Sequence, residues 1–405
     1  MPPLPAVSLI LVSRHRSAAL LRALTAVAQM DHPEFEVIVV ADPAAAAAVR
    51  AGGWPVRMVE FDEANISAAR NLGLGLAAAP VVAFLDDDAV PEPTWLSRLA
   101  APFHDPDVTQ AGGYVRGRSG LGWQWRAMRV DRRGFDHPFD PGPGVSLHRG
   151  DAGVAIKTQG TNCAFRRADL IAAGGFDPAF RFYLDEADVN LRLAASGGLS
   201  AVVPGAVVHH GYAASDRRRA DRTPTDLTEI GASIAAFLRR HAPDDEGAAA
   251  AHLAVQRARL IGLMVAGALE PRDVSRLMAG LRAGMEAGRR RELRAARALP
   301  ALPPSPFSPM PQSGARPGLV LQGRDLDQLR REAAGRVADG HIVTLFALRR
   351  GFRAQIQQFH PGGWWEVTGG RFGKAHRDHP APRFAAPSAR IAQTIALLAG
   401  TRPVR

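Results

Sequence analysis

Three consecutive aspartates, Asp86, Asp87 and Asp88, follow the apolar run Val81 to Leu85. Adjacent carboxylates repel one another, so placing them together costs stability unless a cation lies among them. Mg²⁺ and Mn²⁺ prefer carboxylate oxygens, and their coordination is often completed by the phosphates of a substrate. On an extended segment Asp86 and Asp88 point to the same side, so both can face one ligand. The spacing therefore predicts a site for Mg²⁺ or Mn²⁺, with a solvated acidic turn as the alternative.

The first 110 residues must position this triplet, and they alternate between strand and helix patterns. Apolar, β-branched runs of the buried-strand type alternate with segments of helical spacing. Strands separated by helices imply a parallel sheet that is covered on both faces. Such a sheet binds ligands beyond the carboxyl ends of its strands, which is where the triplet lies. The predicted strands are 7–12, 35–40, 56–61 and 81–85, and the predicted helices are 17–30, 44–51 and 65–79.

The remainder of the chain is predicted to continue this domain and then to leave it. Residues 112–160 are rich in Gly, Pro, Trp and Arg and are expected to form loops, followed by helices over 161–175 and 186–197 and a strand over 200–208. The domain boundaries that follow from the pattern are 1–222 for a catalytic domain, 223–298 for a helical extension, 299–317 for a proline-rich linker and 318–405 for a small α+β domain. Within the last domain we expect a helix over 325–338, a hairpin of 341–348 with 352–359, and a strand over 364–370.

Six motifs, in the same order along the chain, resemble the inverting family 2 glycosyltransferases with the GT-A fold. The resemblance covers roughly residues 5–215. It implies an α/β fold with a Rossmann-like, mostly parallel central sheet flanked by helices, here extended by the helical region and the α+β appendage. It also implies transfer of a sugar from a nucleotide-diphosphate donor to a hydroxyl acceptor, a saccharide or lipid-linked molecule, in surface polysaccharide or glycolipid synthesis. The motifs are Val7–Ser13, Phe35–Asp42, Asn65–Gly73, Phe84–Asp88, Gln159–Arg166 with Gly174–Asp177, and Tyr183–Arg192.

The resemblance also implies how the metal would be held. Asp88 would bind the ion directly, and Asp86 would bind the ribose, or the metal through water. The metal would act as a Lewis acid that neutralises the charge of the leaving diphosphate. A histidine after the last core strand can approach the metal in relatives, so His209 of the pair His209-His210 is the candidate. A structural or surface role for this pair is the alternative.

Further residues on the donor side follow from the same motifs. Arg70 would lie near the diphosphate with Asn71 beside it, and a structural tie between helix and loop is the alternative for both. Asp42 would contact the base, but Ala41-Asp42-Pro43 departs from the paired aspartates of the family, which puts that contact in doubt. The implied donor-binding set is Asp42, Arg70, Asn71, Asp86 and Asp87.

The segment Tyr183–Arg192 resembles the family's catalytic acidic motif. Transfer needs a carboxylate that takes the proton of the acceptor hydroxyl as this attacks the anomeric carbon. The family pair usually reads Glu-Asp with the aspartate as base, whereas this chain has Asp185-Glu186. By its position in the motif Glu186 would be the base, with Asp185 as the second candidate. The alternative is that both residues cap the helix that follows.

Acceptor contacts are expected from Asn162, Asp188 and Trp123. Trp95 and Trp125 also suit a sugar ring, although aromatic residues lie more often in the core. The run Arg217 to Arg219 is a candidate for contact with an anionic ligand, with a solvated basic loop as the alternative.

Composition limits the other functional classes. The formal charge of +11 favours an anionic partner and leaves peripheral contact with an anionic membrane surface open. Nucleic acid is disfavoured as a partner, because aromatic residues make up 6% and no recognition motif is present. The single cysteine, Cys163, excludes an intramolecular disulfide and a Cys-rich metal site. With no secretory pattern at the N-terminus and no apolar run of ~20 residues, we expect a cytoplasmic protein, with the inner face of the membrane as a peripheral location.

Two other activities remain as alternatives. A sugar-1-phosphate nucleotidyltransferase would need a glycine-rich phosphate loop after the first strand, and Ser13 to Arg16 contains no glycine. A catalytically silent GT-A-like binding or scaffold module would not need the acidic pair and the Asp86/Asp88 spacing, which are both intact.

Overall fold

The computed structural model describes residues 3–211, 215–294, 298–299, 305–311, 313–378, 382 and 384–404. The parts of the predicted segments that lie outside the described residues are 1–2 and 212–214 of the first domain, 295–297 of the helical extension, 300–304 and 312 of the linker, and 379–381, 383 and 405 of the last domain. Among the helices of the described residues, none combines the length and apolar character needed to cross a lipid bilayer.

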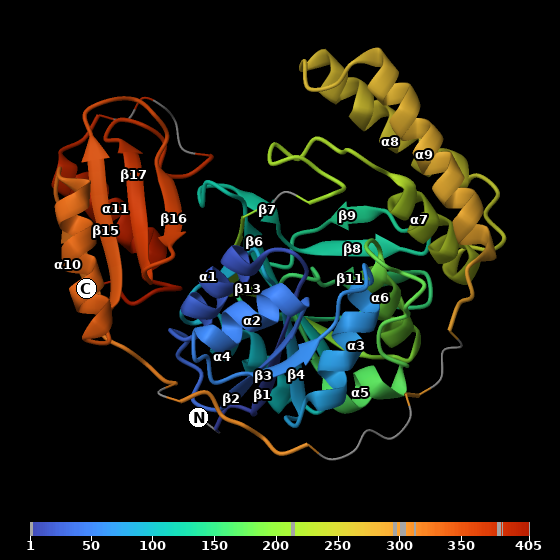
Figure 1. The fold of residues 1–405 in the computed structure, drawn as a ribbon, viewed down its shortest axis with the longest axis horizontal. Helices are drawn as coiled ribbons and strands as arrows, with labels where there is room; N and C mark the ends of the chain where they lie inside the picture. The colour runs from blue at the N-terminus through green and yellow to red at the C-terminus, as the bar shows by residue number, and fades with distance from the viewer. Residues whose placement is uncertain are drawn as a thin grey trace.

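A parallel half-sheet forms the N-terminal part of the molecule, as predicted. Its four strands run in the order β3-β2-β1-β4, and every neighbouring pair is parallel. The helices between them cover the sheet (Figure 1). The prediction of an α/β fold with a mostly parallel central sheet and flanking helices is confirmed. The elements are β1 (Val7–Ser13), α1 (Ser17–Val27), β2 (Phe35–Ala41), α2 (Pro43–Ala51), β3 (Arg57–Glu60), α3 (Ile66–Leu76) and β4 (Val81–Asp86).

The sheet continues beyond β4 through a strand of opposite direction. β12 (Cys163–Arg166) lies antiparallel between β4 and β6 (Val108–Arg116), and β13 (Leu199–His210) runs parallel to β6. Helix α4 (Trp95–Ala100) packs on β13. Short strands β5 (Ala89–Pro91), β7 (Trp123–Trp125) and β10 (Ser146–Arg149) pair at the margins.

Two predictions for this region were wrong. Residues 112–160 are not only loops, because β7, β10 and a separate three-stranded sheet of β11, β8 and β9 lie within them. The predicted helix over 161–175 begins as β12 and becomes α5 (Arg167–Ala172) only afterwards. The buried side chains of β12 are held between two other strands, and this tertiary pairing outweighs the local helical pattern. The small sheet consists of β8 (Met128–Asp131), β9 (Asp136–Pro138) and β11 (Val154–Lys157).

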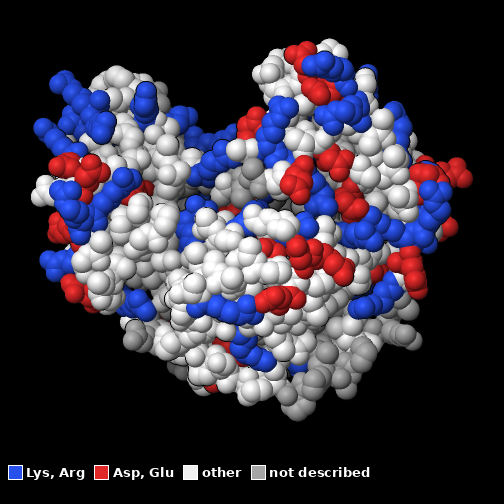
Figure 2. Space-filling view, viewed as in Figure 1, with Lys and Arg blue, Asp and Glu red and all other residues white. Residues whose placement is uncertain are grey.

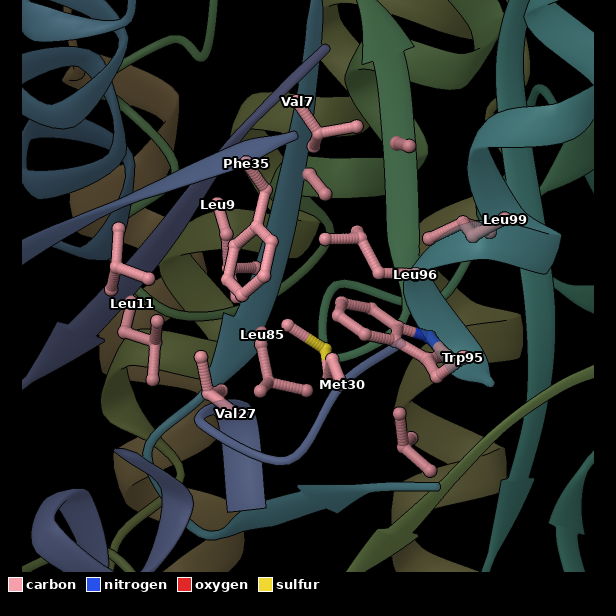
Figure 3. Packing of buried hydrophobic residues seen from close by; sticks show 14 of the residues in the cluster. Val7, Leu9, Leu11, Val27, Met30, Phe35, Leu85, Trp95, Leu96 and Leu99 are labelled. Carbon is pink, nitrogen blue, oxygen red and sulfur yellow. The ribbon is translucent and has the colours of Figure 1, made fainter. Parts of the chain in front are cut away.

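The core beneath the parallel strands is closely packed. Figure 3 shows Phe35, Leu9 and Leu11 of the strands facing Met30, Leu85 and the ring of Trp95. All are nearly or fully buried. Complete burial of a large apolar side chain stabilises a fold by about 1.5–3 kcal/mol. The packing fixes the strand ends, and therefore the site, in place.

The helical extension is a three-helix unit. It consists of α7 (Thr228–His241), α8 (Ala248–Val265) and α9 (Pro271–Arg290). α7 and α9 approach closely because Gly284 and Gly288 carry no side chain; a Cβ at either position would collide with a carbonyl oxygen of α7. α7 also packs near α6 (Asp185–Ala195), which begins with the predicted acidic pair.

Residues 318–404 form a further α/β unit, called here the C-terminal module. Its sheet has the order β14-β15-β17-β16, so the predicted hairpin was wrong: β17 lies between β15 and β16. β14 and α11 were not predicted. The elements are β14 (Gly318–Gln322), α10 (Leu326–Ala338), β15 (Ile342–Arg349), β16 (Ile356–His360), β17 (Trp364–Gly370) and α11 (Pro387–Leu398).

A buried ion pair joins the C-terminal module to the N-terminal sheet. Arg402 donates to Glu92 at 2.6 and 2.9 Å, and both side chains are at most 1% exposed. The Arg402 guanidinium lies 3.7 Å from the ring centre of Trp365, whose ring in turn contacts that of His209. The module therefore docks against Glu92 and against His209, the second-last residue of β13.

Candidate active site

Two aspartates and one histidine meet where β4 and β13 end. Asp86, Asp88 and His210 each offer one ligand atom, and the three atoms all lie within 4.8 Å of one another. Two carboxylates and an imidazole are donors that Mn²⁺ accepts readily, and the carboxylates suit Mg²⁺. We call this group the carboxylate–histidine cluster. Its residues fit the divalent cation that the sequence predicts.

The histidine in the cluster is His210, whereas the sequence analysis selected His209. Successive side chains of a strand point to opposite faces, so only one of the pair can face the aspartates. His210 Nε2 lies 3.2 Å from Asp88 Oδ1, and its Nδ1 lies 3.1 Å from Gln124 Oε1. His209 Nε2 lies 2.8 Å from Glu92 Oε1, on the side of the C-terminal module. The prediction that His209 joins the aspartates is therefore wrong, and His210 takes that position.

Asp87 points away from the cluster into the protein. Its Oδ2 accepts a hydrogen bond of 2.7 Å from the Ser13 hydroxyl, and its Oδ1 lies 2.7 Å from an Arg16 nitrogen. Burial raises the pKa of Asp87, and the Arg16 guanidinium opposes that rise. Asp87 thus ties the end of β4 to the end of β1, and its carboxylate is not exposed to a ligand bound at the cluster.

Two arginines stand beside the cluster. Arg16 Nη1 lies 3.5 Å and Arg218 Nη2 lies 3.6 Å from the same oxygen of Asp88. Arg218 belongs to the basic run noted in the sequence. The sequence analysis missed Arg16, although its position just after β1 places it at the ligand-binding edge of a parallel sheet. These cations are suitably placed for a negatively charged ligand.

Arg70 connects the cluster to the acidic pair. Its guanidinium is buried, binds the Asp185 carboxylate, donates to the Gly160 carbonyl at 3.0 Å and lies 3.5 Å from Asp86 Oδ1. Asn71 exchanges two hydrogen bonds with the backbone of Phe176, at 2.6 and 2.9 Å. Asn71 is therefore a structural tie between helix and loop, which was the alternative to a role at the donor. Arg70 instead links the cluster to the acidic pair.

Asp185 and Glu186 begin α6 in different surroundings. The Asp185 side chain is 4% exposed, and burial raises its pKa despite the opposing charge of Arg70. Glu186 is 17% exposed, and its Oε1 lies 3.8 Å from Lys157 Nζ. The preceding residue, Leu184, has a left-handed backbone with φ 64°, a conformation that is uncommon for residues other than glycine. Strain of this kind is often found where a fold positions functional groups.

Two residues predicted to contact the acceptor are enclosed in the protein. Asp188 is fully buried between Arg192, Arg240 and His241, at 2.7 to 2.9 Å. Asn162 is also fully buried; it accepts from the Trp95 indole at 2.8 Å and donates to two backbone carbonyls. Every polar contact of these side chains is internal, so both hold elements together, and we withdraw them as acceptor contacts.

The remaining predicted residues differ in burial. Asp42 is buried and caps α2, accepting from the backbone N–H groups of His15 at 2.7 Å and of Ala44 at 3.1 Å. Burial would raise its pKa, but these N–H groups outweigh burial and lower it. Trp95 belongs to the core. Trp123 is half-buried under the Arg116 guanidinium, which lies 4.2 Å from its ring centre.

The surface of the described residues includes two hollows of several hundred cubic ångström. One of about 540 Å³ is lined by Trp123, Gln124 and Trp125 and by residues of the C-terminal module. Gln124 and Trp125 contact His210, so this hollow adjoins the carboxylate–histidine cluster. The other, of about 710 Å³, is lined by residues that include Asn65, Asp177 and Arg294. Neither the carboxylate–histidine cluster nor the acidic pair contributes to its lining. The smaller hollow is therefore the one associated with the site.

No curated protein matches this chain. Among solved structures, the chain is similar to the mannosyltransferase PcManGT from Pyrobaculum calidifontis in complex with GDP-Man and Mn²⁺, at 17% identity over 70% of this chain and 87% of that one, with a TM-score of 0.45. It is also similar to GalNAc-T7 with UDP, GalNAc and Mn²⁺, at 14% identity over 59% of this chain and 48% of that one, again with a TM-score of 0.45. The family model described as Glycosyl transferase family 2 matches residues 8–171, about two fifths of the chain, and this segment holds β1 to β4 and the aspartates of the cluster.

Proposed function

We propose that this protein is an inverting glycosyltransferase that moves a sugar from a nucleotide-diphosphate donor to a hydroxyl group of a saccharide or lipid-linked acceptor. The single observation that carries the proposal is the meeting of Asp86, Asp88 and His210 at the end of β4, with Arg70 joining that cluster to the acidic pair. The match of residues 8–171 to glycosyl transferase family 2 supports it.

Asp86, Asp88 and His210 would hold Mg²⁺ or Mn²⁺. When bound there, the cation supplies positive charge to the phosphates of the donor and to the diphosphate as it leaves. Arg16 and Arg218, both near Asp88, are placed to add to that positive charge. Two similar structures were solved with Mn²⁺ and a nucleotide or nucleotide sugar, which agrees with this donor class.

Glu186 is the proposed base, since it is the less buried and less tightly paired member of the acidic pair. The acceptor oxygen forms a bond to the anomeric carbon while the bond from that carbon to the diphosphate oxygen breaks. The diphosphate leaves with the electron pair, and the acceptor proton passes to the Glu186 carboxylate. A single displacement of this kind inverts the anomeric centre. Asp185 orients Arg70 and would remain in place during the reaction.

The proposal also covers the residues around the reacting groups and the cellular context of the reaction. Asp42, Asn71 and Asp87 would act by fixing the strand ends and helices that enclose the donor. Trp123 is retained as an acceptor contact. The expected context is surface polysaccharide or glycolipid synthesis in the cytoplasm, with the inner face of the membrane as a peripheral location.

A thermal-shift panel of UDP, GDP, dTDP and CDP sugars, each with and without Mn²⁺, tests the proposal. A ligand that binds the folded state raises its apparent stability, so one nucleotide class should raise the melting temperature only when Mn²⁺ is present. Asp88→Ala should abolish that shift, and Asp339→Ala, which removes an exposed carboxylate of the C-terminal module, should leave it unchanged. Absence of a cation-linked shift with every donor overturns the proposal. A shift without any turnover on an acceptor panel would favour a silent binding module instead.

A further inference from the structure

The hollow of about 540 Å³ has walls from two parts of the chain that are far apart in sequence. Its inner wall is the segment with Trp123, Gln124 and Trp125, and its outer wall includes Lys374 and Arg377 of the C-terminal module. Backbone hydrogen bonds hold these walls together: Gln357 N–H donates to the Ser119 carbonyl at 2.9 Å. The module therefore completes a pocket that the N-terminal sheet alone would leave open on one side.

The pocket adjoins the carboxylate–histidine cluster through its inner wall. Gln124 Oε1 lies 3.1 Å from His210 Nδ1, and the rings of Trp125 and His210 are 5.7 Å apart. The other nitrogen of His210 faces Asp88. A molecule in the pocket therefore touches side chains that themselves contact the cluster, which puts the pocket next to the proposed donor site.

The charged groups of the pocket all have one sign. Arg222, Lys374 and Arg377 line it, and no acidic residue is among the described residues that line it. Arg222 and Arg377 are exposed and Lys374 is half-buried, so solvent and a ligand can reach all three. Figure 2 shows a notch in this face of the molecule, with Lys and Arg side chains along the wall formed by the C-terminal module and both basic and acidic side chains on the opposite wall. A concave surface with cations and no acid attracts an anion.

The same pocket offers aromatic surface. Trp123 and Trp125 are both half-buried, so part of each indole remains accessible in the pocket. Indole rings combine a large apolar face with a polar N–H group, which suits the mixed apolar and hydroxylated faces of a sugar ring. Cations on one wall and indoles on the other match a sugar that carries a negative charge.

We infer that the C-terminal module makes this pocket an acceptor site for an anionic saccharide, in which Lys374 and Arg377 face the charged group and Trp123 and Trp125 contact the ring. The inference rests on the proposed function in that it names the acceptor class of the same enzyme. It goes beyond that function because Lys374 and Arg377 lie outside residues 8–171, the segment that matches the family. The shared chemistry is a phosphate or a carboxylate on the sugar, and the experiment separates these two sources.

Direct binding to the full chain tests the inference. The probes are glucose 6-phosphate, methyl glucuronide and methyl glucoside, titrated by ligand-observed NMR. We expect the wild-type protein to bind at least one anionic sugar more tightly than the neutral one. Lys374→Gln with Arg377→Gln should weaken that binding on the order of tenfold and leave the neutral sugar unaffected, since each exposed charge contact contributes modestly. The stronger anionic probe identifies phosphate or carboxylate as the preferred group.

A matched control removes the same charge from the same module. Arg331→Gln with Arg336→Gln alters two exposed arginines of α10, on the outer side of the module in Figure 1, and should leave anionic-sugar binding unchanged. Equal binding of neutral and anionic sugars by the wild type, or anionic binding that survives the Lys374/Arg377 change, overturns the inference. The Mn²⁺-linked shift by nucleotide sugars is measured on the same variants and should be unchanged in both, so a failure of this pocket is distinguishable from a failure of the proposed function.

Discussion

Asp185 and Glu186 are adjacent in sequence and their carboxyl groups interact, but each lies beside a different cation. The Asp185 carboxylate is enclosed and paired with Arg70, whereas Glu186 is 17% exposed and has Lys157 at 3.8 Å. Removing one partner of a buried ion pair is costly because the other charge stays behind without compensation. Removing a partly exposed base changes the chemistry more than the fold. These surroundings predict opposite phenotypes for two conservative substitutions.

Glu186→Gln should lower turnover by about 10²–10⁴-fold while the fold and the Mn²⁺-linked donor affinity persist. Asp185→Asn should reduce the free energy of unfolding by about 3–5 kcal/mol, because the Arg70 guanidinium loses its charge partner. Release of nucleoside diphosphate measures the first effect and urea unfolding the second. The reverse pattern, with a stable but inactive Asp185→Asn and an active Glu186→Gln, would make Asp185 the base.

The two histidines at the end of β13 provide a matched pair. His210→Ala should weaken Mn²⁺ binding on the order of tenfold or more, because one ligand of the proposed ion is lost. His209→Ala should leave Mn²⁺ affinity nearly unchanged and instead weaken the contact with Glu92 and Trp365. Calorimetric titration with Mn²⁺ compares the variants. Equal losses of affinity in both would contradict the assignment of His210 to the cluster.

Residue types and motif order predicted the aspartate triplet and the acidic pair as the centre of the site. They could not decide which histidine faces Asp86 and Asp88, because that depends on the face of β13 that each side chain occupies. They also assigned Asn162 and Asp188 to the acceptor, since a motif does not show that every polar atom of a side chain has an internal partner. Arg16 was missed because an arginine after a strand is common.

At the scale of helices and strands, the parallel half of the sheet was predicted well. Apolar runs such as β2, which is buried along its whole length, have few alternatives to a covered strand. β12 was missed because four residues next to a helical segment carry little local signal, and long-range pairing with β4 and β6 decides their conformation. The hairpin of β15 and β16 was predicted from proximity in sequence, whereas β17 is inserted between them.

The link between α1 and β2 contains a histidine that should make stability depend on pH. His32 is fully buried and its Nδ1 accepts a hydrogen bond of 3.2 Å from the Glu34 N–H. Burial lowers the pKa of His32 to about 4. Between the unfolded pKa of about 6.5 and the folded value, the unfolded chain binds a proton that the folded chain does not. Stability from this group is therefore complete above pH ~6.5 and falls as the pH drops toward 4.

His32→Asn should remove that dependence, since the amide oxygen can still accept from Glu34 while no group titrates. The wild type should lose on the order of 2–3 kcal/mol more than this variant between pH 7 and pH 4, because each unit of pKa shift corresponds to about 1.4 kcal/mol. Urea unfolding across this pH range measures the difference. His104→Asn, at an exposed position, is the control and should follow the wild type. A pH slope in His32→Asn equal to that of the wild type would contradict the prediction.

At the scale of the whole molecule, composition predicted a second unit after the proline-rich segment but not where it docks. The docking surface depends on single residues near the far end of the chain, Trp365 and Arg402, which meet Glu92 and His209. Nothing in the local pattern around Glu92 distinguishes it from a solvated acid before a proline. The position of the module matters because it forms one wall of the pocket beside the cluster.

Arg402→Met should destabilise this junction by about 3–5 kcal/mol, because the Glu92 carboxylate loses its arginine partner and stays buried beside the His209 imidazole. We expect the module to separate from the N-terminal sheet before global unfolding, seen as an increased radius of gyration in X-ray scattering and faster chymotrypsin cleavage after Phe307, in the segment that leads to the module. Arg331→Met, at an exposed site of α10, should change neither quantity.

The paired change Glu92→Gln with Arg402→Met distinguishes a charge effect from loss of packing. Replacing both members removes the uncompensated carboxylate, so the double variant should recover much of the stability and the compact shape that the single variant loses. A double variant as unstable as Arg402→Met would mean that the stacking of Arg402 on Trp365, at 3.7 Å, holds the module instead. If the double variant also regains binding of an anionic sugar, the position of the module is what forms the pocket, because neither exchanged residue lines it.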